Sequence, residues 1–376
     1  MKKFVLGVGK TKFGVLADSL PQLIYQVVCE ALKDSSLKIK DIKTVFIGNF
    51  LGGIYQNQLH LGSLFYSLFP DFEGKAIRVE DACAAGSLAA NLAIESLYKE
   101  EFSMAVGVEK MNGAKNTTFG IASAGDRIFD QEEGAIFPAG YALMAQAYFK
   151  KYGATSNDLA LVSLKNHQNA NKNPKAHFYG KEVNLEMIKN SPMVSSPLRL
   201  FDCSPISDGA AAIIFGREKI SKRSIRVLAS SVKHTYISLS QFKDITKIDS
   251  TCKAAKEAYE EAGIKAKDID LAEVHDCFTI AEIIASEDLG FFGRGKGYIA
   301  LREGKTKINA EKPINPSGGL KGGGHPIGAT GTSQIYEAVS QLRGEAGEHQ
   351  VKNPQIALTH NIGGFGGTCV IHIFSR

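Results

Sequence analysis

The sequence predicts an α/β fold made of two related halves, with a long segment inserted into the first half. Three observations predict it. Segments that start at Glu30 and Glu257 repeat each other without a gap. A second pair of similar segments starts at Cys83 and His325. Between the halves lies a polar stretch, roughly 118–200, which is too long for an ordinary connecting loop.

The first repeat predicts the same local structure twice. EALKDSSLKIKDIKTVFIGN starts at Glu30, and EAYEEAGIKAKDIDLAEVHD starts at Glu257. Each segment has a helical pattern, then a K-x-K-D-I turn, then an apolar strand. The alternative is that two helix–turn–strand units resemble each other by chance.

The second repeat extends the duplication. When CAAGSLAANLAIESL is aligned with HPIGATGTSQIYEAVSQL, Gly86 stands opposite Gly328 and Cys83 stands opposite His325. A helix of small residues and then a strand follow in both segments. Alternating helices and strands favour layers with parallel strands. We therefore expect the halves at roughly 1–117 and 225–376, with Cys83 and His325 at matching positions that can face one cleft.

The stretch at roughly 118–200 is expected to form a separate loop domain. It is rich in Asn and Lys. It contains a segment with a helical pattern, ALMAQAYFKKYG, and a segment typical of a loop, NHQNANKNPKAHF. Insertions of this length in a compact protein are usually functional and often cover a site. The segment DCSPISDGAAAIIFG from Asp202 indicates a return to the first half over roughly 201–224, through a buried strand at AAAIIF.

Composition excludes several classes of protein. The chain has 376 residues, with 44 Lys and Arg against 39 Asp and Glu, a net charge of +5. This charge does not indicate a nucleic-acid binder, although it suits an anionic substrate. No run of 18 apolar residues is present, so we expect no membrane span. The first residues make a poor signal peptide, and IHIFSR is no peroxisomal address, so we expect a cytoplasmic location. The six cysteines include no C-x-x-C pair, which argues against a zinc finger or a thioredoxin motif.

Cys83 is a candidate nucleophile. An apolar strand ends at Val79, and a helix of small residues begins just after the cysteine. The positive end of a helix favours thiolate, so this position predicts a lowered thiol pKa. A buried structural cysteine at a strand–helix junction is the alternative.

His325 follows a run of glycines, GGLKGGG, and precedes Pro326, which suits the first turn of a helix. So many glycines suggest that a ligand or another segment of the chain approaches the backbone closely. A catalytic histidine is one interpretation, and a phosphate-binding loop with an incidental histidine is the other. Neither a G-x-x-x-x-G-K-[ST] nor a strict G-x-G-x-x-G pattern is present.

Two further segments follow predicted strands. His275, Asp276 and Cys277 follow the predicted strand LAEV. Residues at the carboxyl ends of strands often form the sites of α/β proteins. A capping His–Asp pair with a core cysteine is the alternative, and a metal site lacks further ligands at suitable spacing. THNIGGFGGTCV from Thr359 is a glycine-rich turn whose backbone N–H groups could bind an oxyanion. The same turn is compatible with a tight hairpin.

Together these motifs resemble the thiolase superfamily. Five of them occur in the family's order: ACAAG, DCSPISDGAAA, HDCF, GGGHPIGATG and NIGGFGG. The resemblance covers essentially the whole chain. It implies two β-α-β-α-β-α-β-β halves packed as five α/β/α/β/α layers, with a loop domain inserted in the first half.

The resemblance also implies roles for individual residues. Cys83 matches the acyl-accepting nucleophile, and His325 matches the histidine that activates it. Gly363 matches the glycine whose N–H, together with that of Cys83, holds the acyl oxyanion. The family's C-x-G motif has Asn361 in place of its cysteine, and its N-E-A-F motif reads HDCF here.

This double change resembles the sterol-carrier-protein-type thiolases and the archaeal acetoacetyl-CoA thiolases. In them the HDCF cysteine, here Cys277, acts as the acid/base. His275 would then help to form the second oxyanion hole, together with a water.

The implied reaction is the condensation of two acetyl-CoA to acetoacetyl-CoA and CoA, as in a mevalonate route. Cleavage of a longer, branched or aromatic 3-oxoacyl-CoA is the alternative. Three other classes fit the motifs less well. A ketoacyl synthase would not need Cys277, and a retro-aldolase relative would lack the pair Cys83 and Cys277. A non-catalytic lipid-binding or scaffold subunit would not need the set of Cys83, Cys277 and His325.

CoA is expected as substrate and product, with no permanent cofactor and no metal. The expected partners are a second copy of the chain, in a homodimer or homotetramer, an OB-fold zinc-containing protein and hydroxymethylglutaryl-CoA synthase.

Overall fold

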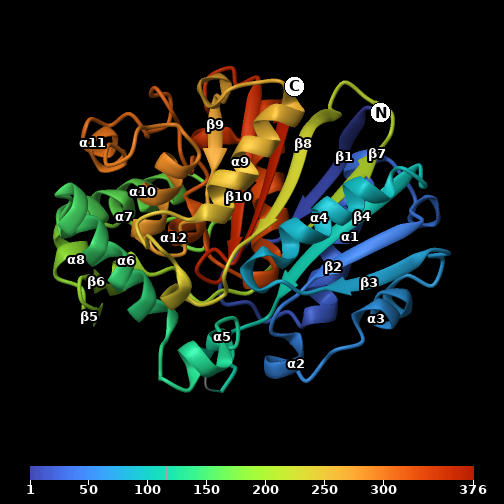
Figure 1. Ribbon diagram of the computed structural model, residues 1–376. Coiled ribbons are helices and arrows are strands. Elements are labelled where there is room, and N and C mark those ends of the chain that lie inside the picture. The colour runs from blue at the N-terminus through green and yellow to red at the C-terminus, as the bar shows by residue number, and fades with distance from the viewer. Residues whose placement is uncertain (116) are drawn as a thin grey trace.

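The computed structural model describes residues 1–115 and 117–376, and its centre is a nine-stranded mixed sheet (Figure 1). The strands lie in the order β3-β2-β4-β7-β1-β8-β11-β10-β9. Their bounds are β1 (Lys3–Lys10), β2 (Thr44–Gly48), β3 (Lys75–Val79), β4 (Phe102–Glu109), β7 (Gly209–Gly216), β8 (Ile225–His234), β9 (Leu271–Glu273), β10 (Ile356–Gly363) and β11 (Thr368–Ser375).

The strand order shows the duplication directly. From the centre outward, one half-sheet runs β1, β7, β4, β2 and β3, and the other runs β8, β11, β10 and β9. In the second half only an isolated parallel bridge between Ala272 and Ile314 stands where the first half has β3. Antiparallel pairing of Lys3–Val5 with Ile225–Val227 joins the two half-sheets.

The first sequence repeat is confirmed element by element. Helices α1 (Leu20–Ser35) and α9 (Asp249–Ala262) end at left-handed caps, Ser36 and Gly263. A 3-10 turn with a capping box follows each helix, η1 (Ile39–Asp41) after α1 and η6 (Ala266–Asp268) after α9. Strands β2 and β9 follow these turns, as the K-x-K-D-I pattern predicts.

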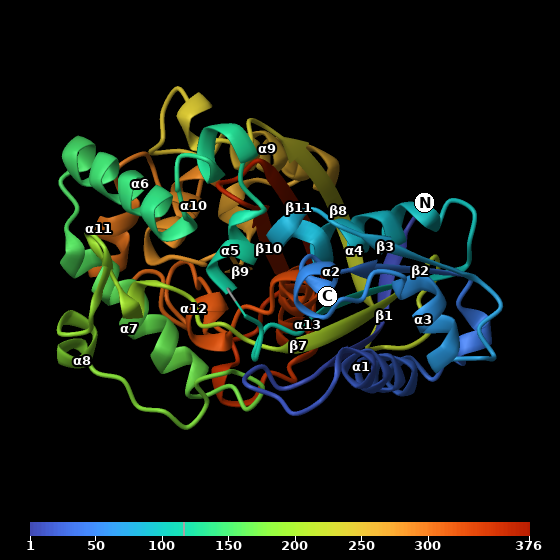
Figure 2. The same cartoon turned by 90° about the horizontal axis from the view of Figure 1, so that it is seen from below.

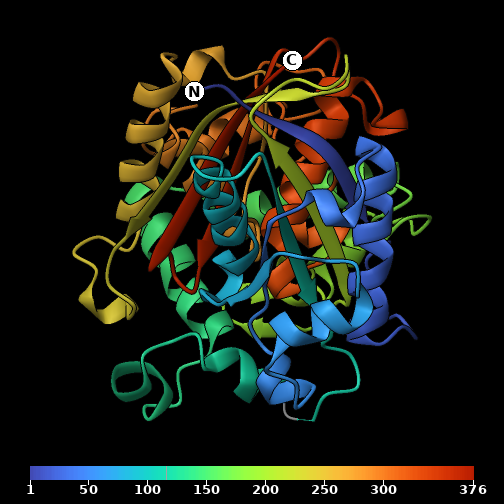
Figure 3. The ribbon, with the colours of Figure 1, turned by 90° about the vertical axis from the view of Figure 1, so that its right-hand side faces the viewer.

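The helices complete five layers. Helix α1 packs on the outer face of the first half-sheet and α9 on that of the second, and Figure 3 shows them on the two opposite sides of the molecule. Between the half-sheets lie α4 (Ala85–Ser96) and α13 (Thr330–Arg343), which contact each other and strands of both halves. The side chains in this middle layer form one core cluster with the inner faces of both half-sheets.

The two central helices cross at glycines. A Cβ on Gly86 would lie 2.6 Å from the carbonyl oxygen of Gly328, so only glycine allows this approach. The turn η2 (Ala82–Ala84) leads into α4 as η7 (Ile327–Ala329) leads into α13. By these bounds Cys83 corresponds to Gly328, and the alignment of Cys83 with His325 is wrong. His325 lies on the loop before η7.

The inserted segment is mainly helical. It contains α5 (Thr117–Ala122), a π-helical turn η3 (Arg127–Gln131), α6 (Phe137–Tyr152), α7 (Ser156–Ala170), α8 (Leu185–Lys189) and the small sheet of β5 (Met193–Ser195) and β6 (Leu198–Arg199). Figure 2 shows α6 and α7 beside α10 (Thr279–Asp288) and α12 (Gly319–Gly323). After it β7 pairs with β4 and β1, so the chain returns to the first half-sheet. The exact domain boundaries stay a prediction.

Among the residues that the structure describes, none of the helices combines the length and the apolar character that a membrane crossing needs.

Candidate active site

Cys83 lies in the turn η2, between β3 and α4. The residue before it, Ala82, has φ 47°, in the left-handed region that favours glycine. A non-glycine residue held there costs about 1–3 kcal/mol, and such strain clusters at functional sites. The turn therefore presents the sulfur in a backbone conformation that the surrounding packing must enforce.

Two histidines lie beside the sulfur. Cys83 Sγ and one ring nitrogen each of His275 and His325 all lie within 4.8 Å of one another. The two imidazole rings are nearly perpendicular, at 87°, with their centroids 5.2 Å apart. His275 follows the end of β9 and His325 precedes η7, so the tertiary fold brings three predicted site residues together from three segments.

The thiol of Cys83 is protonated at rest. Burial raises its pKa to about 12, and the carboxylates of Glu109 and Glu80 act in the same direction. The backbone N–H of Gly364 opposes them through a hydrogen bond to the sulfur. The prediction of a lowered pKa at a helix N-terminus is therefore wrong, because desolvation outweighs the helix dipole. A neighbouring base must remove the proton before the sulfur can attack.

The orientation of His325 would allow it to accept this proton, and its role as the base stays a prediction. Thr330 Oγ1 lies 2.7 Å from His325 Nδ1 and donates its own proton to the Pro326 carbonyl at 3.1 Å. Since the hydroxyl proton is engaged, Oγ1 must accept from Nδ1–H, which leaves Nε2 with a free lone pair. Burial lowers the pKa of His325 to about 3, so the ring is neutral.

Cys277 completes the predicted set from the end of the loop before α10. Its thiol is buried, and burial raises its pKa well above the usual range, with the neighbouring Cys83 acting in the same direction. The neighbouring hydroxyl of Tyr141 opposes this rise in the pKa. It donates its single proton to the Gly364 carbonyl at 2.9 Å. Tyr141 comes from α6 of the inserted segment, and no local motif singled it out.

Asp276 lies between His275 and Cys277 in sequence but faces another part of the fold. Its carboxylate accepts from the backbone N–H groups of Leu320 and Lys321, at 2.6 and 3.2 Å, and from Asn166 Nδ2 at 2.7 Å. These bonds hold the start of α12, the glycine-rich segment that leads to His325. Asp276 is therefore an anchor of that segment and no proton-transfer partner of His275.

Gly363 lies at the end of β10, against the turn that carries Cys83. A Cβ at this position would lie 3.0 Å from the Asp81 carbonyl oxygen and 3.6 Å from Ala84 Cβ. The close approach explains why a glycine stands here. The oxyanion role of its N–H stays a prediction.

Among the described residues, Cys83, His275 and His325 also form a His2Cys set of a kind that binds zinc. The same three residues belong to the site of the predicted acyl transfer.

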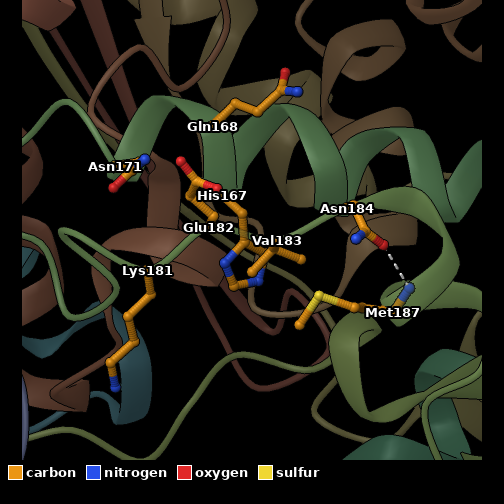
Figure 4. Close-up of a pocket in the computed structure, with 8 residues that line it drawn as sticks. All are labelled: His167, Gln168, Asn171, Lys181, Glu182, Val183, Asn184 and Met187. Carbon is orange, nitrogen blue, oxygen red and sulfur yellow. Dashed lines mark hydrogen bonds between the residues drawn. The ribbon is translucent and has the colours of Figure 1, made fainter.

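A separate cavity of about 460 Å³ lies between the end of α7 and the segment before α8 (Figure 4). His167 and Lys181 are among its lining residues, and none of the predicted site residues lines it. It therefore plays no part in the site around Cys83.

Comparisons with known proteins match the whole chain. The family model "Thiolase, N-terminal domain" matches residues 4–219, and "Thiolase C-terminal domain-like" matches residues 230–376. An "Acetyl-CoA acetyltransferase" of Methanothermobacter thermautotrophicus is 45% identical, over 99% of both chains. The "Benzoylsuccinyl-CoA thiolase subunit BbsB" of Thauera aromatica is 35% identical, over 96% of this chain and 95% of that protein. A solved "Ltp2-ChsH2(DUF35) aldolase" superposes with a TM-score of 0.87 at 23% identity, over 99% of this chain and 97% of the other.

Proposed function

Because the chain belongs to the thiolase family, we propose that it condenses two acetyl-CoA molecules to acetoacetyl-CoA and CoA through an acyl-enzyme on Cys83. Membership of this family identifies the chain as an acyltransferase. The choice of acetyl-CoA is supported by the archaeal relative, which carries that activity in its name over the same length of chain. The reaction is reversible, so the same site would also cleave acetoacetyl-CoA with CoA.

The first half-reaction would acylate Cys83. His325 Nε2 takes the thiol proton, and the thiolate attacks the thioester carbonyl of acetyl-CoA. The N–H groups of Cys83 and Gly363 would hold the oxyanion that forms. The C–S bond to CoA then breaks, and the CoA thiolate takes the proton of Cys277. This leaves an acetylated Cys83, a free CoA, a protonated His325 and a Cys277 thiolate.

The second half-reaction would use that Cys277 thiolate as a base. It removes an α-proton from a second acetyl-CoA, and the resulting enolate attacks the acetyl group on Cys83. Cys83 leaves as a thiolate and takes back its proton from His325, so every group returns to its starting state. A raised pKa suits Cys277 here, because a stronger base removes a weakly acidic α-proton more readily.

One observation carries the proposal: the sulfur of Cys83 and one ring nitrogen each of His275 and His325 lie within 4.8 Å of one another, and the two histidines are buried whereas Cys83 is partly exposed. His325 offers a lone pair there, because Thr330 holds its other nitrogen. A non-catalytic lipid-binding or scaffold subunit would not need this arrangement.

The test is acylation of the intact protein by acetyl-CoA, followed by mass spectrometry. The unmodified chain should gain one acetyl group, and Cys83→Ala should gain none. Cys29→Ala, which changes a partly buried cysteine on α1, is the matched control and should acylate normally. If Cys83→Ala is still acetylated at another cysteine, the nucleophile is assigned wrongly.

Cleavage of a longer, branched or aromatic 3-oxoacyl-CoA is the second candidate function. The Thauera aromatica relative, named as a benzoylsuccinyl-CoA thiolase subunit, favours it. A panel of 3-oxoacyl-CoA esters assayed in the cleavage direction separates the two functions. A preference for an aromatic or long-chain ester over acetoacetyl-CoA would overturn the acetyl assignment.

The proposal includes an assembly. CoA serves as substrate and product with no permanent cofactor, and the supply of acetoacetyl-CoA would suit a mevalonate route in the cytoplasm. A homodimer or homotetramer is proposed, and the unpaired edge of β3 with its exposed Ile77 offers a surface for it. An OB-fold zinc-containing protein and hydroxymethylglutaryl-CoA synthase are proposed as further partners. The solved Ltp2-ChsH2(DUF35) aldolase, whose name includes a DUF35 component, supports the first of these.

A further inference from the structure

We propose that Asn361 is a positioning residue that fixes the tautomer of His275, so that the Nε2–H of His275 points into the site as a hydrogen-bond donor. The inference rests on the proposed function, since the group that receives this bond would be the enolate oxygen of the second acyl-CoA. It assigns a role to the asparagine that stands where the resemblance leads one to expect a cysteine.

The sheet places the two side chains opposite each other. Strands β9 and β10 are parallel, with Ala357 paired to Leu271 and Thr359 to Glu273. Two residues further along, this register sets Asn361 beside His275. Their side chains meet there, with Asn361 Nδ2 at 2.8 Å from His275 Nδ1.

The direction of this bond decides where the proton lies. With Nδ2 facing the ring, the amide donates and Nδ1 of His275 accepts, while Oδ1 of Asn361 is left without a partner among the described residues. A neutral imidazole carries one proton, and it must then be on Nε2. Nε2 is buried and has no hydrogen-bond partner among the described residues. A buried donor without a partner is costly, which is expected where a ligand supplies the missing acceptor.

The surroundings keep this ring neutral and fixed. Burial lowers the pKa of His275 well below its usual range, and His325 and His360 act in the same direction. Cys83, the other titratable group beside the ring, is a protonated thiol at neutral pH. The backbone N–H of His275 donates to His360 Nδ1 at 3.3 Å, which holds the main chain.

The two histidines are therefore complementary. Thr330 leaves Nε2 of His325 as an acceptor for the Cys83 proton, and Asn361 leaves Nε2 of His275 as a donor. A base and a donor side by side can serve two steps of one reaction. Since His275 does not change its charge, its tautomer alone determines whether it can stabilise an oxyanion.

Asn361→Asp tests the inference because it reverses the direction of the bond while the size of the side chain stays the same. A carboxylate accepts from Nδ1–H, so a neutral His275 would have no proton on Nε2. Exchange of the α-protons of acetyl-CoA with deuterated water should fall about 100-fold at pH 8, as expected when one oxyanion donor is lost. Acylation of Cys83 should stay unchanged, because it uses His325 and the backbone N–H groups.

The pH profile separates this role from a structural one. The new carboxylate should raise the pKa of His275, and below that pKa the imidazolium carries protons on both nitrogens. Exchange by Asn361→Asp should therefore recover as the pH is lowered, whereas the unmodified protein has no such dependence. Thr359→Val, a change of similar size on the same face of β10, is the control and should show neither effect.

A direct readout does not depend on activity. In protein labelled with 15N at histidine, His275 should show a protonated Nε2, assigned by comparison with His275→Gln, and Asn361→Asp should move the proton to Nδ1. A bare Nε2 in the unmodified protein would overturn the inference, as would equal losses of exchange and acylation in Asn361→Asp. Failure of the proposed function is a different result, in which the unmodified protein neither acylates nor exchanges, and the tautomer is then judged by the 15N signals alone.

Discussion

Replacing Gly86 by alanine should damage the reaction more than it damages the fold. Gly86 lies in the first turn of α4, directly behind Cys83, and faces the turn η7 of the other half. The new Cβ would lie 2.6 Å from the carbonyl oxygen of Gly328, and ordinary contact begins at 3.4 Å. The two segments would have to separate by about 0.8 Å.

This displacement acts on the site directly, because η7 follows His325 and η2 carries Cys83. A misplacement of about 1 Å costs roughly 100-fold in rate, so we expect kcat/KM to fall by about that factor. Overpacking of this kind costs about 1–3 kcal/mol of stability. The variant should therefore fold and melt a few degrees lower while losing nearly all of its activity.

The assays are acylation by acetyl-CoA, followed by mass spectrometry, and thermal unfolding. Gly293→Ala is the matched control, since its new Cβ would find its nearest neighbour, Lys296 Cγ, at 3.8 Å. That variant should keep both the activity and the Tm. If Gly86→Ala loses stability as expected but keeps its acylation rate, the separation of the two turns does not control the chemistry and the reasoning fails.

Three further predictions concern single groups. Cys277→Ala should still acetylate Cys83 but should lose α-proton exchange, and normal exchange would instead point to a histidine as the base. Thr330→Val leaves Nδ1–H of His325 without its acceptor, so acylation should slow by about 10- to 100-fold, and an unchanged rate would contradict the assigned tautomer. Burial would raise the pKa of Glu337, but Lys10, at 2.6 Å, and the nearby His349 hold it well below its usual range. The stability from this ion pair is present above the unfolded-state pKa and is lost as the pH falls through the folded-state pKa. Glu337→Gln should thus have a lower Tm at pH 7 and a smaller further loss in acid, and an equal loss would refute the linkage.

Local patterns predicted the elements well where each half repeats the other. The segment from Glu30 and the segment from Glu257 both fold as a helix, a capped 3-10 turn and a strand. The alignment of the second repeat was wrong because glycines occur at several positions in both segments. Only the crossing of α4 and α13 shows that Gly86 faces the turn of Gly328.

The site was predicted in part. The structure brings Cys83, His275 and His325 together, as the motifs imply. Tyr141 was missed because it reaches Cys277 from the inserted segment, more than a hundred residues away in sequence, and carries no local signal. Asp276 points elsewhere because the loop after β9 turns it toward the start of α12.

The sequence by itself determined the duplicated α/β architecture, the family, and the residue types available for acyl transfer. These follow from short-range periodicity and from motifs, which each segment carries on its own. The tertiary structure alone decided the protonation of the site. Burial keeps the thiols of Cys83 and Cys277 protonated, and Thr330 and Asn361 set which histidine nitrogen carries a proton. Desolvation and hydrogen-bond direction depend on atoms from distant segments, so no local pattern in the sequence could have specified them.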